Sequence, residues 1–553
     1  MKEEVDVEIY WCKKCNVPVI KEINNNGGKC NYCHGDLFYL SKDIRPVFPE
    51  ERLLFEIIND CPMKYYKCSV WRVRGKYCID GEKFNISPIK LNLLDTDEIR
   101  KKLKIYSENN DYKYFNMFIS KFIDVNKSRL NYIKNEAMYF IKEIVKKYPN
   151  EAPVISFSGG KDSTVVSDLV IKALSNASVP HIFCDTTLED KYTIEYVKRI
   201  KSNNPKMLIN ICKNNDHNFF DICDDIGPPS RYMRWCCTMF KTGPITQLLN
   251  RMFPNKNVIS FIGIRKCESS IRSKYKRVEK SSSTVKIRKQ RSCSPIFYWK
   301  DVDVWLYILS EKIDFNYNYR IGNSRVGCWM CPNSGDTQYF MNKIYLPKEA
   351  EMWRKHLINF AVKTDKKDPI GYVDSKQWTF RRGGKGLISA KDVDIYQSSC
   401  TKEENAVIYK LNKPIKDWFY TLFIPFGKLS KSLGRNLLNE VICSDVKSKF
   451  PILSIQPYSN EENDFSVKIK SLGSANDKLI HKRVKNQVMK YNACRQCLKC
   501  ESVCTRGAIK IRDGKYTIDE EKCIHCGICM DSKFIHGGCM MCGILSVSKN
   551  GEK

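Results

Sequence analysis

Cysteine is the residue type of this chain most able to do chemistry. The sequence has 27 cysteines among 553 residues, and most of them stand in tight pairs and triplets. In a reducing compartment such cysteines do not serve as a disulfide framework, so metal binding or redox chemistry is the leading interpretation.

The first cysteines form two CxxC knuckles, Cys12 with Cys15 and Cys30 with Cys33. Each knuckle turns both sulfurs toward one ion, and four thiolates around tetrahedral zinc can order a segment too small to own a core. The spacing predicts a structural zinc ribbon over residues 1–40, with no ligand position left open for catalysis. A single iron held by the same four thiolates is the alternative.

A second motif, SFSGGKDST, follows a short apolar run and precedes an amphipathic helical pattern. Two adjacent glycines let backbone N–H groups turn toward a phosphate in front of a helix N-terminus. Neighbouring hydroxyl, ammonium and carboxylate groups suit the phosphates and their Mg²⁺. It is not a Walker A loop, which needs GxxxxGK[ST]. The predicted phosphate-binding residues are Ser158, Gly159, Gly160, Lys161, Asp162 and Ser163.

This string resembles the PP-loop of the adenine nucleotide α-hydrolase superfamily, which includes the phosphoadenosine phosphosulfate (PAPS) reductase family. IFCDTTLED, GIRKCESSIR and SPIFYWKDVDVWLYI follow in the order that the family shows. In the third string, Asp303 is among the matching positions. The resemblance implies further nucleotide-binding residues, which are Asp185, Thr186, Gly263, Arg265 and Arg272. It implies catalytic roles for Lys161, Asp162, Asp185 and Arg265, with the arginines pairing phosphate or sulfate.

Four central cysteines stand in a CC…CxxC arrangement: Cys236, Cys237, Cys328 and Cys331. The arrangement resembles the [4Fe–4S] site of the iron–sulfur adenylyl-sulfate reductases, and the surrounding strings are similar to those of DNA phosphorothioation sulfurtransferases. The resemblance implies a cluster held by four thiolates. A four-cysteine zinc site is the alternative, and one of the adjacent pair could instead be a reactive thiol.

The C-terminal cysteines resemble a bacterial two-cluster ferredoxin, in which the fourth cysteine of each motif ligates the other cluster. By that rule Cys504 joins the second triplet, and either Cys539 or Cys542 completes the first. An insertion, SKFIHGG, leaves that choice open. The nine cysteines are Cys494, Cys497, Cys500, Cys504, Cys523, Cys526, Cys529, Cys539 and Cys542.

The elements that position these residues predict a multidomain α/β chain. Strand-like runs alternate with helical patterns over 151–395, which indicates a doubly wound parallel sheet and, by resemblance, a PAPS reductase-like domain with its own [4Fe–4S] site. Residues 41–150 read as a small β module and a helical linker, the helical pattern running over 111–147. Residues 396–485 are mixed and unassigned, although YTLFIPFG and FSVKIKSLG look like strands. The resemblance to two-cluster ferredoxins implies that residues 486–553 form a ferredoxin-like domain with two [4Fe–4S] clusters.

The chain is strongly basic, with a formal charge of +31. Four thiolate metal sites would remove about eight of these charges and leave it basic. Either solubility or a polyanionic partner such as tRNA or DNA explains the excess, and residues 265–291 concentrate it. The sequence lacks a long apolar stretch and a secretory leader, which predicts a cytoplasmic protein without membrane contact.

Two departures bear on the reaction. The reductases carry their nucleophilic cysteine in an ECG motif, and no ECG string occurs in this sequence. The PP-loop is intact, as it is in enzymes that cleave ATP between the α and β phosphates. Both favour ATP-dependent activation of an acceptor followed by sulfur transfer, with a cysteine desulfurase as a source of sulfur. The alternatives are reduction of PAPS or adenylyl sulfate to sulfite, and a non-catalytic nucleic-acid-binding redox sensor.

These interpretations predict three [4Fe–4S] clusters, one zinc, and either Mg-ATP or PAPS or adenylyl sulfate as the nucleotide. They also predict an external electron donor such as ferredoxin or flavodoxin.

Overall fold

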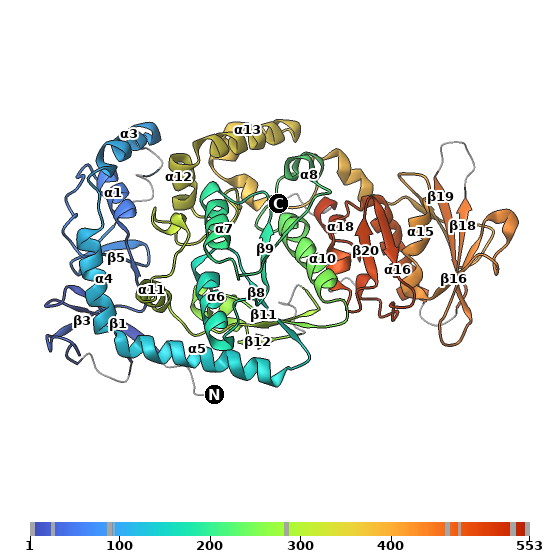
Figure 1. Ribbon diagram of the computed structural model, residues 1–553. Coiled ribbons are helices and arrows are strands. Elements are labelled where there is room, and N and C mark those ends of the chain that lie inside the picture. The colour runs from blue at the N-terminus through green and yellow to red at the C-terminus, as the bar shows by residue number, and fades with distance from the viewer. Residues whose placement is uncertain are drawn as a thin grey trace.

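A mostly parallel sheet at the centre of the molecule carries the segments of the nucleotide motifs (Figure 1). The computed structural model describes residues 6–23, 28–85, 91, 94–280, 287–458, 465–473, 477–530 and 538–547. Most of the SKFIHGG insertion and residues 281–286 of the basic stretch lie outside these ranges. The expected doubly wound α/β architecture is confirmed for this central part.

The strand order of the central sheet is β10-β9-β8-β11-β13-β12. The chain moves outward from β8 in one direction and then returns to place β11 on its other side, so the order reverses between β8 and β11. Ligands of such sheets bind where the order reverses, outside the carboxyl ends of the strands. The parallel strands are β8 (Ala152–Ser156), β9 (His181–Asp185), β10 (Ile209–Lys213), β11 (Val258–Phe261) and β13 (Gln290–Cys293), and the short β12 (Val278–Glu279) is antiparallel.

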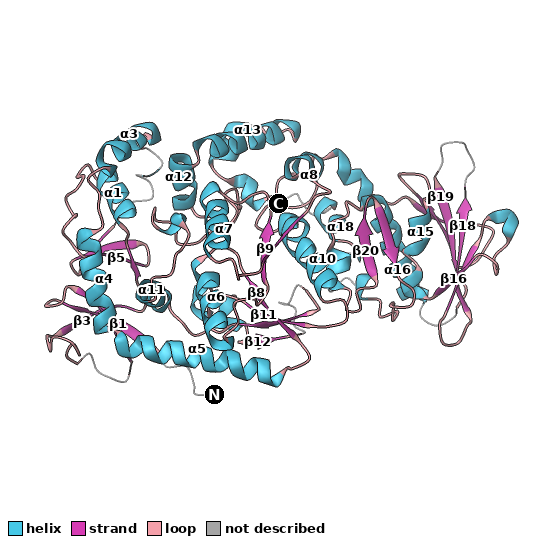
Figure 2. Ribbon diagram, viewed as in Figure 1, coloured by secondary structure: helices cyan, strands magenta, loops and turns pink. Residues whose placement is uncertain are grey.

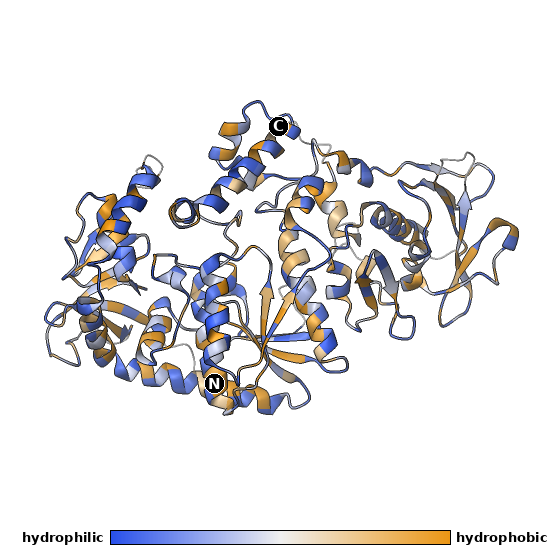
Figure 3. Cartoon of the chain, turned by 45° about the horizontal axis from the view of Figure 1, so that its top comes forward, coloured by the Kyte–Doolittle hydropathy of each residue, from blue (hydrophilic) through white to orange (hydrophobic). Residues whose placement is uncertain are grey.

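Helices cover the sheet because their apolar residues recur with helical spacing. Val165, Val166 and Leu169 of α6 are fully buried, and α6 packs between α5 and α11. In Figure 3 the strands of the central sheet are largely hydrophobic, whereas the helices around them carry both hydrophilic and hydrophobic residues. These helices are α5 (Lys127–Lys147), α6 (Lys161–Leu174), α7 (Lys191–Asn203), α8 (Phe219–Ile226), α10 (Gly243–Met252) and α11 (Asp301–Ser310).

The N-terminal part contains two small antiparallel sheets. One has the order β2-β1-β3, with β1 (Val7–Cys12), β2 (Val17–Glu22) and β3 (Leu37–Ser41). The other consists of β4 (Arg45–Pro46), β5 (Val70–Val73), β6 (Lys76–Ile79) and β7 (Glu82–Phe84), the short strands expected there. Helices α1 (Pro49–Ile58) and α3 (Thr96–Ser107) complete this part.

The helical pattern over 111–147 forms two consecutive helices. Helix α4 (Lys113–Val125) ends at Asn126, and α5 begins directly after it. The Asn126 carboxamide accepts a hydrogen bond from the Ile20 N–H at 2.7 Å and donates one to the Pro18 carbonyl at 3.0 Å. The break therefore docks the helix pair on strand β2.

Beyond the central sheet, chain order and spatial order differ (Figure 1, Figure 2). The cysteine-rich C-terminal segment lies between the central sheet and a second sheet of six antiparallel strands, which occupies the far end. This second sheet has the order β14-β15-β19-β18-β17-β16. Its strands are β14 (Gln397–Ser399), β15 (Ala406–Lys410), β16 (Lys428–Ser430), β17 (Val441–Ser444), β18 (Pro451–Tyr458) and β19 (Ser466–Ser471).

One expectation for this region is confirmed and one is wrong. FSVKIKSLG contains β19, whereas YTLFIPFG continues from the short helix α15 (Asp417–Thr421) into a 3-10 turn over Ile424–Phe426. The run is apolar because Leu422 and Phe423 are fully buried. A short apolar run gives no periodicity that separates a strand from a buried turn.

The remaining helices flank the site region or belong to the C-terminal segment. They are α12 (Asp336–Tyr345), α13 (Pro347–Lys363), α14 (Pro369–Asp374), α16 (Asp477–Ala493), α17 (Lys499–Val503) and α18 (Met540–Leu545), with the hairpin β20 (Ile509–Arg512) and β21 (Lys515–Ile518). Every helix among the described residues is too short or too polar to span a bilayer.

Candidate functional site

The predicted PP-loop joins β8 to α6 at the reversal of strand order. Gly159 has a φ of +71°, a backbone conformation that glycine adopts without strain, and Gly160 caps α6. The Ser163 hydroxyl accepts from the Ser158 N–H at 3.2 Å and donates to the Gly160 carbonyl at 2.8 Å. The loop is therefore fixed by its own hydroxyl groups, with the helix N-terminus behind it.

Four charged side chains meet beside this loop, and they are called the charge quartet below: Lys161, Asp162, Arg265 and Asp301. Asp162 lies 2.9 Å from the Lys161 ammonium and 2.7 Å from Arg265 Nε. Asp301 lies 3.1 Å from the same ammonium and 2.9 Å from Arg265 Nη2. Both cationic residues are 4% exposed, so each carboxylate bridges two buried cations.

The quartet is formally neutral, and its ionised state is held by mutual attraction. Burial alone would raise the pKa of Asp162, but the charges of Arg265 and Lys161 outweigh it and lower that pKa to about 2. Burial alone would lower the pKa of Lys161, and the two carboxylates raise it instead. Two cations able to take phosphate oxygens thus stand beside two carboxylates able to take Mg²⁺.

Two other predicted residues frame the quartet. A Cβ on Gly263 would lie 2.7 Å from the backbone carbon of Asp162, so only glycine lets the segment after β11 approach the PP-loop this closely. Arg272 forms an ion pair with Glu268, whose carboxylate also accepts from the Arg265 N–H at 3.2 Å. Arg272 therefore contacts the quartet through Glu268.

The end of β9 forms the other edge of the site. Asp185 closes a turn by accepting from the Thr187 N–H at 2.8 Å, and the Thr186 hydroxyl donates to Glu189 at 2.7 Å. That hydroxyl also lies 3.7 Å from the Cys328 sulfur. The segment expected near adenosine is thus in contact with a cysteine of the predicted central cluster.

The four central cysteines gather at this edge. Cys236 and Cys237 end the short helix α9 (Trp235–Cys237), and a π-helix over Thr238–Thr242 follows. The pKa of Cys236 is raised, first by the neighbouring Cys237 thiol, then by burial, and then by the nearby Cys328 and Cys331. Burial raises the pKa of Cys328 to about 12. Such thiols become thiolates most readily when a metal cation takes their charge, so the donor set fits a cluster.

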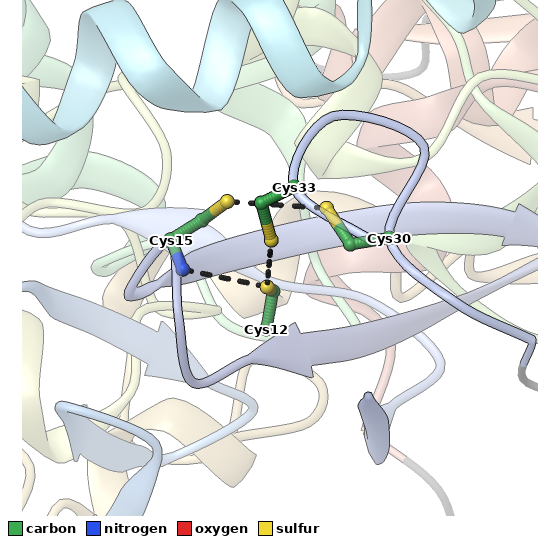
Figure 4. A group of neighbouring side chains, drawn as sticks. All are labelled: Cys12, Cys15, Cys30 and Cys33. Carbon is green, nitrogen blue, oxygen red and sulfur yellow. Dashed lines mark hydrogen bonds between the residues drawn. The ribbon is translucent and has the colours of Figure 1, made fainter. Parts of the chain in front are cut away.

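The four cysteines of the two N-terminal knuckles lie close together (Figure 4). Cys12 and Cys33 lie 3.3 Å apart between sulfurs, Cys15 and Cys30 lie 3.9 Å apart, and all four ligand atoms lie within 4.8 Å of one another. This is the spacing of ligands around one ion. In a cubane each thiolate binds a different iron, which sets the sulfurs further apart.

The C-terminal cysteines divide into two groups, which are called the near set and the far set below. In the near set, burial raises the pKa of the Cys494, Cys497 and Cys500 thiols, and the nearby Cys539 thiol adds to each rise. Cys539, burial and Cys494 in turn raise the pKa of Cys542, so Cys539 and Cys542 both adjoin this set. The near set is Cys494, Cys497 and Cys500, with Cys539 or Cys542 as its fourth member.

The far set consists of Cys504, Cys523, Cys526 and Cys529. Burial raises the pKa of Cys529 to about 12, and Cys500 of the near set, Cys504 and Cys526 add to the rise. Lys490, 1% exposed, donates to the Cys529 carbonyl at 2.7 Å and also faces Cys500 and Cys539. A buried cation between the two sets favours the negative charge that thiolate-bound clusters carry.

Several site residues had no signal in the sequence. Asp301 completes the quartet, whereas Asp303, which matches the family string, pairs with Arg129 at 2.9 Å away from the loop. Tyr319 accepts the Lys161 N–H at 2.9 Å, and Glu189 holds Thr186. Asp301 and Glu189 lie inside the quoted family strings but were not among the predicted site residues, and Tyr319 lies outside those strings.

The basic stretch is largely paired inside the fold. Arg277 contacts Glu136, Arg291 contacts Glu151, and Lys280 contacts Glu151 as well. Lys274 and Lys276 are exposed. The described part of this stretch is therefore mostly structural, which leaves less charge for a polyanion than the sequence suggested.

Comparison with known proteins agrees with this geometry. Residues 152–334 match the family model described as "Phosphoadenosine phosphosulfate reductase domain". Two uncharacterized proteins of Methanocaldococcus jannaschii are 32% identical over 282 residues and 31% identical over 249 residues. These matches cover 50% and 45% of this chain and 56% and 58% of the relatives, so the chain spans just over half the length of the curated relatives it matches first.

A relative with an assigned activity is similar over the same region. The adenosine 5'-phosphosulfate reductase of Staphylococcus haemolyticus is 24% identical over 196 residues, which are 35% of this chain and 75% of that protein. Among solved structures, the phosphoadenylyl-sulfate reductase of Candida auris in its phosphate complex aligns with a TM-score of 0.29 and 16% identity. That alignment covers 36% of this chain and 95% of the other.

Proposed function

We propose that this protein is an iron–sulfur enzyme that binds Mg-ATP on the PP-loop and uses it to activate an acceptor for sulfur transfer. The observation that carries the proposal is the charge quartet beside the loop. The acceptor we propose is a nucleic acid, tRNA or DNA, which the net charge of +31 and the exposed Lys274 and Lys276 support.

The neutrality of the quartet favours a magnesium-bound pyrophosphate chain as its ligand. A bare anion gains little from cations that are already neutralised at 2.7–3.1 Å. A magnesium nucleotide brings its own cation for Asp162 and Asp301, and so leaves Lys161 and Arg265 for the phosphate oxygens. Adenylyl sulfate lacks the β and γ phosphates that would chelate this ion.

In the reaction, Lys161 and Arg265 stabilise charge that develops on the phosphates, and the N-terminus of α6 adds its N–H groups. The carboxylates of Asp162 and Asp301 orient the metal. Asp185 and Thr186 line the edge at which we expect the adenosine. The central cysteines would hold a [4Fe–4S] cluster, which supplies electron or sulfur chemistry when bound.

The contact between Thr186 and Cys328, 3.7 Å long, is the second support. It joins the nucleotide edge to the central cysteine set, so a nucleotide and a cluster would act on one acceptor in one place. The zinc ribbon has a structural role in this proposal, and it packs against the α4–α5 break through Asn126.

Reduction of adenylyl sulfate or PAPS to sulfite is the second candidate. The relatives named adenosine 5'-phosphosulfate reductase favour it, as does the presence of two further cysteine sets that fit clusters. The missing ECG motif and the magnesium-type quartet favour the first candidate.

One experiment separates the two. Anaerobic protein is incubated with Mg-ATP, with and without bulk tRNA or DNA, and separately with adenylyl sulfate or PAPS and a reductant. The proposal predicts AMP and pyrophosphate that increase with nucleic acid and vanish in Lys161→Ala. Sulfite formed without ATP would select the reductase and refute the proposal.

A further inference from the structure

The near set and the central cysteine set lie on two sides of one packed junction. A Cβ on Gly243 would lie 2.6 Å from the Cβ of Leu498, so the start of α10 touches the turn between Cys497 and Cys500. Gly243 directly follows the π-helix that begins after Cys237. The backbone of Gly243, near one predicted cluster, therefore packs directly on the side chain of Leu498, near another.

Further contacts hold this junction together. The Thr246 hydroxyl donates to the Ser502 hydroxyl at 3.2 Å, and α10 packs on α17. Cys497, Cys539 and Trp235 belong to one buried apolar cluster that spans both parts of the chain. Arg495 pairs with Asp225 at 2.6 Å and with Asp392 at 2.5 Å. The C-terminal segment is thus anchored to the central domain at the near set.

The far set contains the exposed thiol of the two sets. Cys526 is exposed and Cys504 and Cys523 are half-buried, whereas Cys529 is buried; in the near set Cys494 is half-buried and Cys497 and Cys500 are buried. His525 Nδ1 lies 2.9 Å from the Ile424 carbonyl, which belongs to the part of the chain that carries the second sheet. An external protein can approach the far set at Cys526.

We infer that electrons enter at the far set, pass to the near set, and leave through the Gly243–Leu498 junction to the central cysteines. The inference rests on the proposed iron–sulfur character of the protein. At each step one electron passes from a reduced site to the next site. The first site is oxidised by one electron and the next site is reduced by one electron. The source is an external one-electron, low-potential reductant protein that docks at Cys526.

The first test compares the two sets by electron paramagnetic resonance of fully reduced, anaerobic, full-length protein. The central signal is identified by its loss in Cys328→Ser. We expect magnetic broadening of that signal in the wild type. The broadening should disappear in Cys497→Ser, which removes the near cluster, and persist in Cys526→Ser, which disturbs the far one. No broadening in the wild type, or the reverse pattern in the variants, would overturn the inference.

The second test concerns the junction. With a reduced ferredoxin as donor, Gly243→Val should lose the fast phase of central-site reduction, and Gly335→Val, which has open space around it, should keep it. A Gly243→Val protein with full iron and an unchanged fast phase contradicts the junction. Neither measurement uses ATP, so its failure is distinct from failure of the nucleotide proposal.

Discussion

Replacing Asp301 by Asn tests the charge quartet most sharply. The change keeps the shape of the side chain and removes one of two carboxylates that neutralise Lys161 and Arg265. Both cationic residues are 4% exposed, so the quartet changes from neutral to a buried charge of one. Breaking a buried pair from one side costs about 3–5 kcal/mol of stability.

The same change should reverse the effect of magnesium on the affinity for ATP. At about 4 Å and an effective dielectric constant of 20, one uncompensated charge attracts an anion by up to about 4 kcal/mol. Even a third of this energy makes Mg-free ATP bind about tenfold tighter to Asp301→Asn than to the wild type. Mg-ATP should bind more weakly, because one carboxylate is lost to the metal.

The assay is isothermal titration with ATP in magnesium and in EDTA. The matched control is Asp303→Asn, two residues further along α11, whose carboxylate pairs with Arg129 at 2.9 Å and lies away from the loop. It should lose stability without a change in the magnesium requirement. Equal magnesium dependence in the wild type and both variants would refute the assignment of Asp301 to the nucleotide site.

Three more predictions concern the glycine approach, a buried histidine and the ribbon. Gly263→Ala should abolish nucleotide binding, because the new Cβ would lie 2.7 Å from the Asp162 backbone, whereas Gly335→Ala, in open space, should bind normally by titration calorimetry. Burial lowers the pKa of His181 from 6.5 to about 4, so the unfolded chain binds the proton more tightly and stability falls as pH drops below 6.5. The loss at pH 5 should be about 2 kcal/mol in denaturant unfolding and absent in His181→Gln; equal pH profiles would contradict this. Cys30→Ser should lose about one zinc per chain by elemental analysis, while Cys400→Ser, outside the ribbon, should keep it; retained zinc in Cys30→Ser would argue against the ribbon site.

The central fold was predictable because its strands and glycine turns follow one another in a regular alternation. Strands β8 and β11 are separated by about a hundred residues, yet their carboxyl ends meet, as parallel neighbours at a reversal of order must. That rule brings Lys161 and Arg265 together. It is the reason why the motif residues of the sequence fall in one place.

Asp301 was not predictable in the same way. Asp301 and Asp303 differ by two positions, about 200° around a helix, so they point to different sides of α11. Nothing in the sequence tells which side faces the loop. The sequence could not decide between Cys539 and Cys542 either, because that choice depends on how the chain after the insertion packs against Lys490.

Binding of Mg-ATP observed through the central cluster is the most direct test of the account. Anaerobic protein is reduced, and the central iron signal is recorded by electron paramagnetic resonance before and after addition of Mg-ATP. Because Thr186 joins the nucleotide edge to Cys328, we predict a change in this signal that is absent in Lys161→Ala. A wild-type signal that does not respond to saturating Mg-ATP, or a central domain without iron, would contradict the account.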